Sequence, residues 1–244
     1  GQAFFSLSLG MGMLITYGSY INDDNNIISS ATLITLTDVG IAFLAGLIVF
    51  PFVFSSGIET QGGPGLIFQV FPQIFQELGG LTGIIIGSTF FILLSFAAIT
   101  STVSLLEVPV SYLVDEYKIE RKYSVWLVAI VILLIGIPSV FSQGKSIFFS
   151  EFITYFGSEK PIDFMQFIID VSNDTLLPFG GFMITIYVAY IWKKNNLTEE
   201  ISKGNPKYKG SLMEKYINFS ITYICPLILG SIFLLTFLNK FFGI

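Results

Sequence analysis

Six long apolar blocks dominate the sequence and limit the folds open to it. They cover roughly residues 1–20, 36–56, 83–114, 123–141, 164–192 and 216–238. Each is long enough to cross a bilayer as a helix, which needs about 20 apolar residues. The alternation of apolar and polar residues that marks membrane β-strands is missing from these blocks. The sequence therefore predicts an all-α, multi-pass membrane protein with six transmembrane helices.

Composition supports a protein whose main partner is membrane lipid. Of the residues, 53% are hydrophobic and 12% charged, and the mean hydropathy is +0.76, far from the balance of a soluble domain. The chain has no histidine and one cysteine, Cys225, in an apolar run that indicates packing. An intramembrane enzyme would need a nucleophile paired with a base, and this composition disfavours one. The net charge of −5 without a basic stripe predicts no nucleic-acid partner.

Basic residues indicate the orientation of the chain. Nine of the twelve lie in the segments 118–122 and 193–215, which the positive-inside rule places in the cytoplasm. Since each predicted span crosses the membrane once, these two cytoplasmic segments place residues 57–82 and 142–163 outside and residues 21–35 inside. The loop 21–35 carries Asp23 and Asp24 and no basic residue, so it gives the rule no support.

The opening block contains residues that disfavour a regular helix. Gly10 and Gly12 each cost about 1 kcal/mol in a helix relative to Ala, and Ser6 and Ser8 compete for backbone hydrogen bonds. A break here would expose carbonyls and half-helix ends able to bind ions. A small-residue surface for helix packing explains the same residues. The residues alone leave both interpretations open.

Neutral oxygens gather in the third block. Ala97, Thr100 and Ser101 are spaced i, i+3 and i+4, so one carbonyl and two hydroxyls share a helical face. Such a neutral set suits Na⁺ better than Ca²⁺ or Mg²⁺. Hydroxyls that hydrogen-bond back to their own helix, or to a neighbouring helix, are the alternative.

Four acidic residues lie within or at the ends of the blocks: Asp38, Glu107, Asp170 and Asp174. A carboxylate in a span costs about 2.5–3.5 kcal/mol and usually has a functional partner. Asp38 also suits an N-terminal cap or first helical turn, and Glu107 also suits a structural hydrogen-bond node. The pair one turn apart, Asp170 and Asp174, faces either an external vestibule or solvent.

The external segment 57–82 is too long and apolar for a passive loop. Its Gly-Gly-Pro-Gly turn precedes three phenylalanines and a proline, Phe68, Phe71, Pro72 and Phe75. This pattern predicts a folded lid packed onto the helices.

Five stretches occur in the order typical of one transporter family: GQAFFSLSLGMG, LAGLIVFP, GGPGLIF, ITSTVSLLEVP and DVSNDTLLPFGG. With these stretches the chain resembles the neurotransmitter:sodium symporters, especially their bacterial amino-acid transporters with a leucine-transporter-like fold. The resemblance implies spans six to eleven of that fold: a five-helix inverted repeat over residues 1–192, then a cytoplasmic loop and final helix over 193–244. The first helix would be unwound in its middle, and the N-terminal half of the transporter would be a missing partner. It also implies a bacterial inner (plasma) membrane.

The resemblance implies roles around an amino-acid substrate. Phe5 would be the aromatic lid, and with Asp170 it would form the outer gate. The arginine partner of Asp170 would lie in the missing half, which leaves Asp170 without its counter-charge here. The implied substrate contacts are Phe5, Ser6, Ser8, Met11, Ser101 and Leu105.

The resemblance also implies two sodium sites, each completed by residues of the missing half. Ser6 and Asp38 would bind the first Na⁺, and Ala97, Thr100 and Ser101 the second. Many relatives have Asn where Asp38 stands. Because a fixed carboxylate supplies the negative charge that chloride brings in those relatives, we expect transport without chloride.

Together these features favour sodium-coupled symport of a neutral, hydrophobic amino acid by alternating access, because the candidate pocket residues are mostly apolar. An ion channel would need a repeated pore filter, and no such motif is visible. A non-transporting half-size scaffold or truncated fragment stays open as an alternative.

Overall fold

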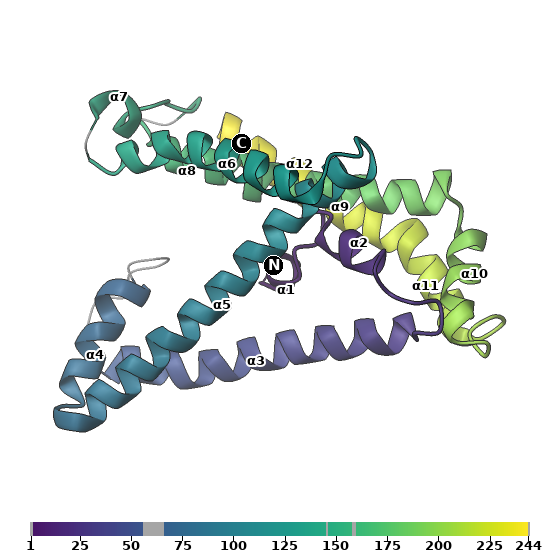
Figure 1. Cartoon of the computed structure of the whole chain (residues 1–244), viewed down its shortest axis with the longest axis horizontal. Coiled ribbons are helices and arrows are strands. Elements are labelled where there is room, and N and C mark those ends of the chain that lie inside the picture. The colour runs from purple at the N-terminus through teal and green to yellow at the C-terminus, as the bar shows by residue number, and fades with distance from the viewer. Residues whose placement is uncertain (1, 56–65, 145, 158–159, 244) are drawn as a thin grey trace. The chain divides into compact units, whose positions relative to one another are not determined.

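The computed structural model describes residues 2–55, 66–144, 146–157 and 160–243, and in these ranges the protein is almost entirely helical (Figure 1). Five helical segments are long and apolar enough to cross a membrane: Ile27–Pro51, Gly80–Asp115, Arg121–Ser142, Phe164–Ile191 and Leu212–Phe242. The expectation of an all-α protein with several membrane-spanning helices is confirmed. The sixth predicted span, residues 1–20, is not among these five, because the structure divides it into two short helices.

Contacts divide the chain into two compact units. One contains residues 1–33 and 106–244, and the other contains residues 34–105. The boundaries fall inside the two long helices α3 (Ile27–Ser55) and α5 (Gly80–Asp115). The predicted repeat boundary at residue 192 stays a prediction.

The first unit begins with two short helices. Helix α1 (Gln2–Ser6) and helix α2 (Met13–Gly18) are separated by residues 7–12, which form turns (Figure 1). Gly10 and Gly12 have φ values of 92° and 83°, and Ser8 has 51°. Glycine adopts this left-handed region at little cost, whereas most other residues avoid it. The two glycines therefore make the interruption possible.

The interruption packs closely on α9 (Leu177–Ile186). A Cβ atom added to Gly180 would lie 2.5 Å from the carbonyl oxygen of Gly10, and one added to Gly10 would lie 2.4 Å from the carbonyl oxygen of Leu177. Only glycine at both positions allows the two backbones to approach this closely.

Two spans each contain a π-helical segment that ends two residues before a proline. The segment Phe164–Ile191 consists of α8 (Phe164–Ile169), η2 (Asp170–Leu176), α9 and η3 (Tyr187–Ile191), and Pro178 follows η2. The last span consists of α11 (Leu212–Phe219), η4 (Ser220–Ile224) and α12 (Cys225–Phe242), and Pro226 follows η4.

The prolines explain these wider turns. Proline has no amide hydrogen and its ring crowds the carbonyl four residues earlier, so a π-helical turn before it relieves the clash. For Pro226 that carbonyl belongs to Thr222, and it accepts a hydrogen bond of 2.9 Å from the Tyr190 hydroxyl. The side chain of a neighbouring span thus satisfies a carbonyl that the helix releases, as an apolar environment requires.

The remaining helices of the first unit are α6 (Arg121–Ser142), α7 (Ile147–Ser150) and α10 (Lys194–Gly204). Lys203 of α10 contacts Asp23 at 3.4 Å, and the backbone of Gly204 lies against Asn25. The loop after α2 therefore lies on the same side as the lysine-rich segment 193–215. This contact supports the predicted cytoplasmic placement of residues 21–35, which their own charges did not support.

The second unit places a short helical pair between two long helices. Segment η1 (Leu66–Val70) and helix α4 (Phe71–Glu77) pack through Val70, Phe71 and Ile74 on Val53 of α3. Phe90 of α5 meets Phe71 edge-to-face at a centroid distance of 4.9 Å. Residues 66–77 of the predicted lid are thus folded and packed, while its Gly-Gly-Pro-Gly turn lies outside the described residues.

The Gly10–Gly180 approach generates a stability prediction. Gly180→Ala should lower the free energy of unfolding by about 1–3 kcal/mol, because the added methyl group has to displace backbone rather than a flexible side chain. Thermal unfolding of the detergent-solubilised protein measures the effect.

Gly136→Ala in α6 is the matched control, since nothing lies within 4 Å of its added Cβ. It should be neutral or stabilising by up to ~1 kcal/mol. Equal unfolding temperatures for the two variants would show that the close approach is absent.

Candidate functional site

The predicted substrate residues of the opening segment lie on both sides of the interruption. Phe5 and Ser6 end α1, whereas Ser8 and Met11 belong to the turns. Phe5 is 44% exposed, and its ring meets Phe4 edge-to-face at a centroid distance of 6.3 Å.

A cavity of about 430 Å³ lies beside this segment, between it and the helices α9 and α12. Its lining is apolar and includes Phe4, Leu9, Ile184, Ile228 and Leu229. Of the predicted substrate residues only Ser8 lines it. Within the first unit, Phe5, Ser6 and Met11 do not line this cavity, and the substrate pocket stays a prediction.

The predicted ligands of the second sodium share one turn of α5. The Thr100 hydroxyl donates to the carbonyl oxygens of Ala97 at 2.9 Å and Phe96 at 3.1 Å. Ser101 is exposed. Two of the three predicted sodium ligands, the Ala97 carbonyl and the Thr100 hydroxyl, thus lie next to each other. The alternative interpretation, a hydroxyl that hydrogen-bonds to its own helix, also holds for Thr100. The hydroxyls of Ser95, Thr102 and Ser104 do the same along α5.

Asp38 lies well inside α3, and its Oδ2 atom is buried. The alternative of a cap or first-turn acid is wrong, because α3 begins at Ile27 and the Asn26 side chain accepts the Ser29 amide at 3.1 Å. Asp38 belongs to the second unit and Ser6 to the first, so their joint sodium site stays a prediction. The same holds for Leu105 and the residues of the broken segment.

Asp170 lies at the centre of a buried charged cluster. Its carboxylate is 1% exposed and contacts the Lys240 ammonium at 2.9 Å, and Lys240 also reaches Asp174 at 3.2 Å. The Gln166 amide and the Tyr155 hydroxyl donate to the same carboxylate, at 2.7 Å and 3.1 Å. Burial, followed by the neighbouring Asp170, raises the pKa of the Tyr155 phenol above its ordinary value.

The expectation that Asp170 lacks a counter-charge is therefore wrong. The cation comes from the end of α12, 70 positions along the chain, so no local pattern reveals the pair. One signal was present: Lys240 is one of three basic residues on the predicted outer side, where the positive-inside rule disfavours them.

Glu107 has partners that the sequence analysis did not identify. Its carboxylate accepts from the Tyr20 hydroxyl at 2.7 Å and from the Arg121 guanidinium at 2.6 Å. The Glu107 side chain is 14% exposed and that of Arg121 61%. The interaction links the end of the opening segment to α5 and to the first residue of α6. Together with the Asp23–Lys203 contact, it brings three predicted cytoplasmic segments to one side.

The Asp170 cluster generates a stability prediction. Lys240→Met should lower the free energy of unfolding by about 3 kcal/mol, because it leaves a buried carboxylate without a cation. Lys240→Arg keeps the charge and should restore most of the loss. Chemical or thermal unfolding of the solubilised protein provides the measurement.

Lys203→Met makes the same chemical change at exposed ion pairs with Asp23 and Glu200, and it should lower stability much less than Lys240→Met, because solvent screens exposed pairs. A Lys240→Met variant as stable as the Lys203→Met variant would mean that Lys240 does not neutralise Asp170.

Comparisons with known proteins agree with this architecture. The model of the sodium:neurotransmitter symporter family matches residues 1–241. An uncharacterized sodium-dependent transporter of Bacillus subtilis, YhdH, is 33% identical over 96% of this chain and 49% of its own length. A similar transporter of Haemophilus influenzae is 33% identical over 96% of this chain and 48% of its own length.

Among solved structures, MhsT in complex with L-phenylalanine is 36% identical, with a TM-score of 0.82 over 95% of this chain and 49% of that chain. This match shows the leucine-transporter-like fold. The chain spans about half the length of these relatives. With a family model that covers nearly every residue and five helices able to span a membrane, this multi-pass membrane protein belongs to the sodium:neurotransmitter symporter family.

Proposed function

We propose that this chain forms part of a sodium-coupled symporter for neutral, hydrophobic amino acids. Its family and its sodium-dependent relatives support sodium coupling. The related MhsT structure contains L-phenylalanine, which supports an amino acid with an apolar side chain. The observation that carries the proposal is the interruption at residues 7–12, between α1 and α2.

The two short helices would together form one unwound transmembrane helix, the first of six in this chain. In a bilayer an irregular backbone is tolerated where protein or a water-filled cavity surrounds it. Carbonyls and amides that leave helical bonding can then bind the charged ends of an amino acid and its ions. Ser6 and Ser8 would contact the substrate backbone, Phe5 would cover it, and Met11 would adapt to its side chain.

Two sodium ions would bind as co-substrates, with further ligands from residues outside this chain. Ser6 and Asp38 would contribute to the first site, and Ala97, Thr100 and Ser101 to the second. The donors suit Na⁺ because neutral oxygens dominate and one carboxylate is present. The carboxylate of the substrate would itself bind the first Na⁺. This direct contact would couple amino-acid transport to the sodium gradient.

Transport would follow alternating access. Sodium would favour the outward-open state, the substrate would close the outer gate at Phe5 and Asp170, and the helices would then open inward. Because a ligand shifts such an equilibrium only through differential affinity, sodium has to bind one state more tightly.

Binding measurements test this function. L-Phenylalanine and L-leucine should raise the unfolding temperature of the intact transporter in Na⁺ and not in K⁺, with a smaller effect of L-alanine. Thr100→Val should raise the Na⁺ concentration needed for half of this shift by at least about tenfold, because a dipole contact to a charged group contributes about 1.5–3 kcal/mol.

Thr102→Val is the matched control, since the Thr102 hydroxyl also bonds to its own helix, at 2.8 Å from the Ala98 carbonyl oxygen, but lies off the predicted sodium face. Equal effects of Thr100→Val and Thr102→Val would reject the second sodium site. Stabilisation that is equal in Na⁺ and K⁺ would reject sodium coupling.

Asp38 carries a second prediction. Uptake by the intact transporter should proceed without chloride, and Asp38→Asn should make it depend on chloride, since the mutant loses the fixed negative charge near the first Na⁺. Asp23→Asn, an identical change at an exposed loop position, should leave uptake independent of chloride. A chloride requirement in the parent protein, or none in Asp38→Asn, would contradict this role.

A further inference from the structure

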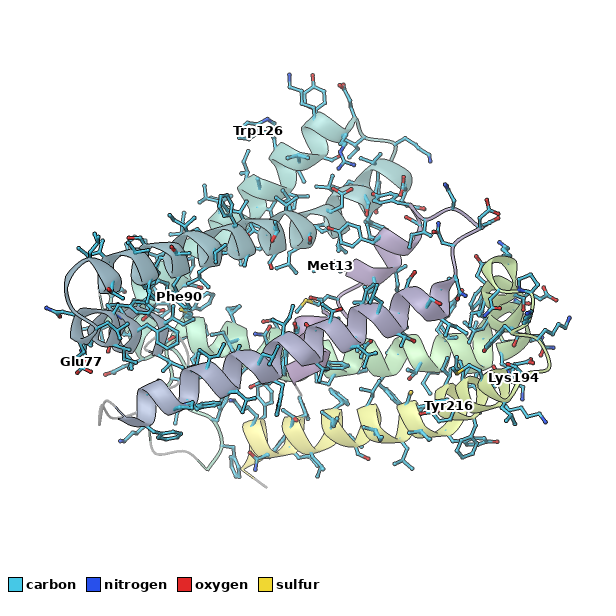
Figure 2. All side chains as sticks on the ribbon, turned by 90° about the horizontal axis from the view of Figure 1, so that it is seen from below. Met13, Glu77, Phe90, Trp126, Lys194 and Tyr216 are labelled. Carbon is cyan, nitrogen blue, oxygen red and sulfur yellow. The ribbon has the colours of Figure 1, made fainter. Side chains whose placement is uncertain are left out.

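A polar groove lies away from the sites above, where α10 begins beside α11 and η4. Its volume is about 410 Å³, and its lining includes Lys194, Glu214, Lys215, Asn218, Phe219 and Tyr223. Lys194 and Tyr216 mark this end of the first unit in Figure 2. The residues come from the end of one membrane span and the start of the next, joined by the lysine-rich segment.

The groove has a net positive charge, because two lysines and one glutamate line it. In the part of the chain that the structure describes, neither Lys194 nor Lys215 forms an ion pair. Glu214 is engaged elsewhere: its carboxylate accepts from the Gly210 amide at 2.5 Å and from the Thr198 hydroxyl at 3.2 Å. Both ammonium groups are therefore available to an anion.

The order of residue types along the helix matches the depth profile of a membrane surface. Lys215 and Asn218 lie in the first turns of the span Leu212–Phe242, and Phe219 and Tyr223 follow. At 1.5 Å per residue, Lys215 and Tyr223 are about 12 Å apart along the axis, comparable to a headgroup layer and the first acyl carbons below it. Aromatic residues at this depth are typical of the interface.

We propose that this groove binds an anionic phospholipid of the cytoplasmic leaflet, of the phosphatidylglycerol type. Lys194 and Lys215 contact the phosphodiester, and Phe219 and Tyr223 contact the start of the acyl chains. The positive-inside distribution places the groove in the leaflet where such lipids meet basic residues, and basic pockets between spans on this side bind anionic headgroups.

The charge complementarity decides between lipid classes. A zwitterionic phosphatidylcholine brings its own cation near the two lysines, whereas phosphatidylglycerol has one net negative charge. A free phosphate ion would satisfy the lysines and leave Phe219 and Tyr223 without a ligand contact. The inference concerns a surface apart from the proposed transport site and does not depend on that function.

Native mass spectrometry of the intact protein in detergent, titrated with phosphatidylglycerol or phosphatidylcholine, tests the proposal. Phosphatidylglycerol should bind more tightly. The double variant Lys194→Gln/Lys215→Gln should weaken its binding by about 30-fold, because each lysine near a membrane surface contributes about fivefold. The variant should fold, since it breaks no ion pair among the described residues.

Lys207→Gln/Lys209→Gln removes the same charge from the same segment outside the groove and should leave binding within about threefold of the parent. Equal weakening by the two double variants, equal binding of the two lipids, or displacement of the lipid by millimolar inorganic phosphate would overturn the proposal. If the groove variant does not fold, Lys194→Gln and Lys215→Gln each replace it, with about fivefold weakening expected and no weakening contradicting the site.

Discussion

The close backbone contact between Gly10 and Gly180 is the interaction that holds the turns at residues 7–12, between the short helices α1 and α2, against α9. Residues 7–12 give up regular helical hydrogen bonding, which an apolar environment penalises heavily. Local turns recover part of it: the Ser8, Leu9 and Met11 amides bond to carbonyls three to five residues earlier. Packing against α9, which two glycines permit, covers one side of the segment and leaves residues 7–12 partly buried. The turns at residues 7–12 are stabilised because Gly180 of α9 leaves room for their backbone.

The same requirement explains the π-helical turns. Pro178 and Pro226 each remove one helical amide, and a π-helical turn precedes each of them. At Pro226 the released carbonyl of Thr222 accepts the Tyr190 hydroxyl. At the turn segment 7–12 and at Pro226, an irregular backbone that glycine or proline causes is therefore matched by a contact from a neighbouring element of the same unit.

Hydropathy was enough to locate the five long helices, because contact with lipid selects long apolar runs whatever the tertiary contacts are. The start of α3 was predicted nine residues late, since Ser29, Ser30 and Thr32 lower the local hydropathy while Asn26 caps the helix. The break in the opening segment was suggested by its glycines. The contact that holds it required α9, which lies far away in sequence.

Charged partners were the least predictable part of the site. The acids could be recognised one by one, because a carboxylate in an apolar block is unusual. Their cations could not, since Lys240 and Arg121 lie on other helices and are set by packing. The outcome for Asp170 shows the limit of transferring a role from a family: the acid matches, but this chain supplies a cation of its own.

The distribution of these ion pairs bears on the cost of the proposed conformational change. On the predicted cytoplasmic side, Glu107 pairs with an Arg121 side chain that is 61% exposed, so water can replace the contact when it opens. On the predicted outer side, Asp170 is 1% exposed and Lys240 32%, so opening there has to hydrate a buried carboxylate or supply another cation. The Glu107–Arg121 and Asp170–Lys240 contacts have similar lengths, 2.6 Å and 2.9 Å. The greater burial of Asp170 therefore makes the outer ion pair the one that needs more free energy to separate. A transporter with this arrangement would need ligand binding, or a competing cation, to release its outer side, whereas hydration alone would assist the inner one.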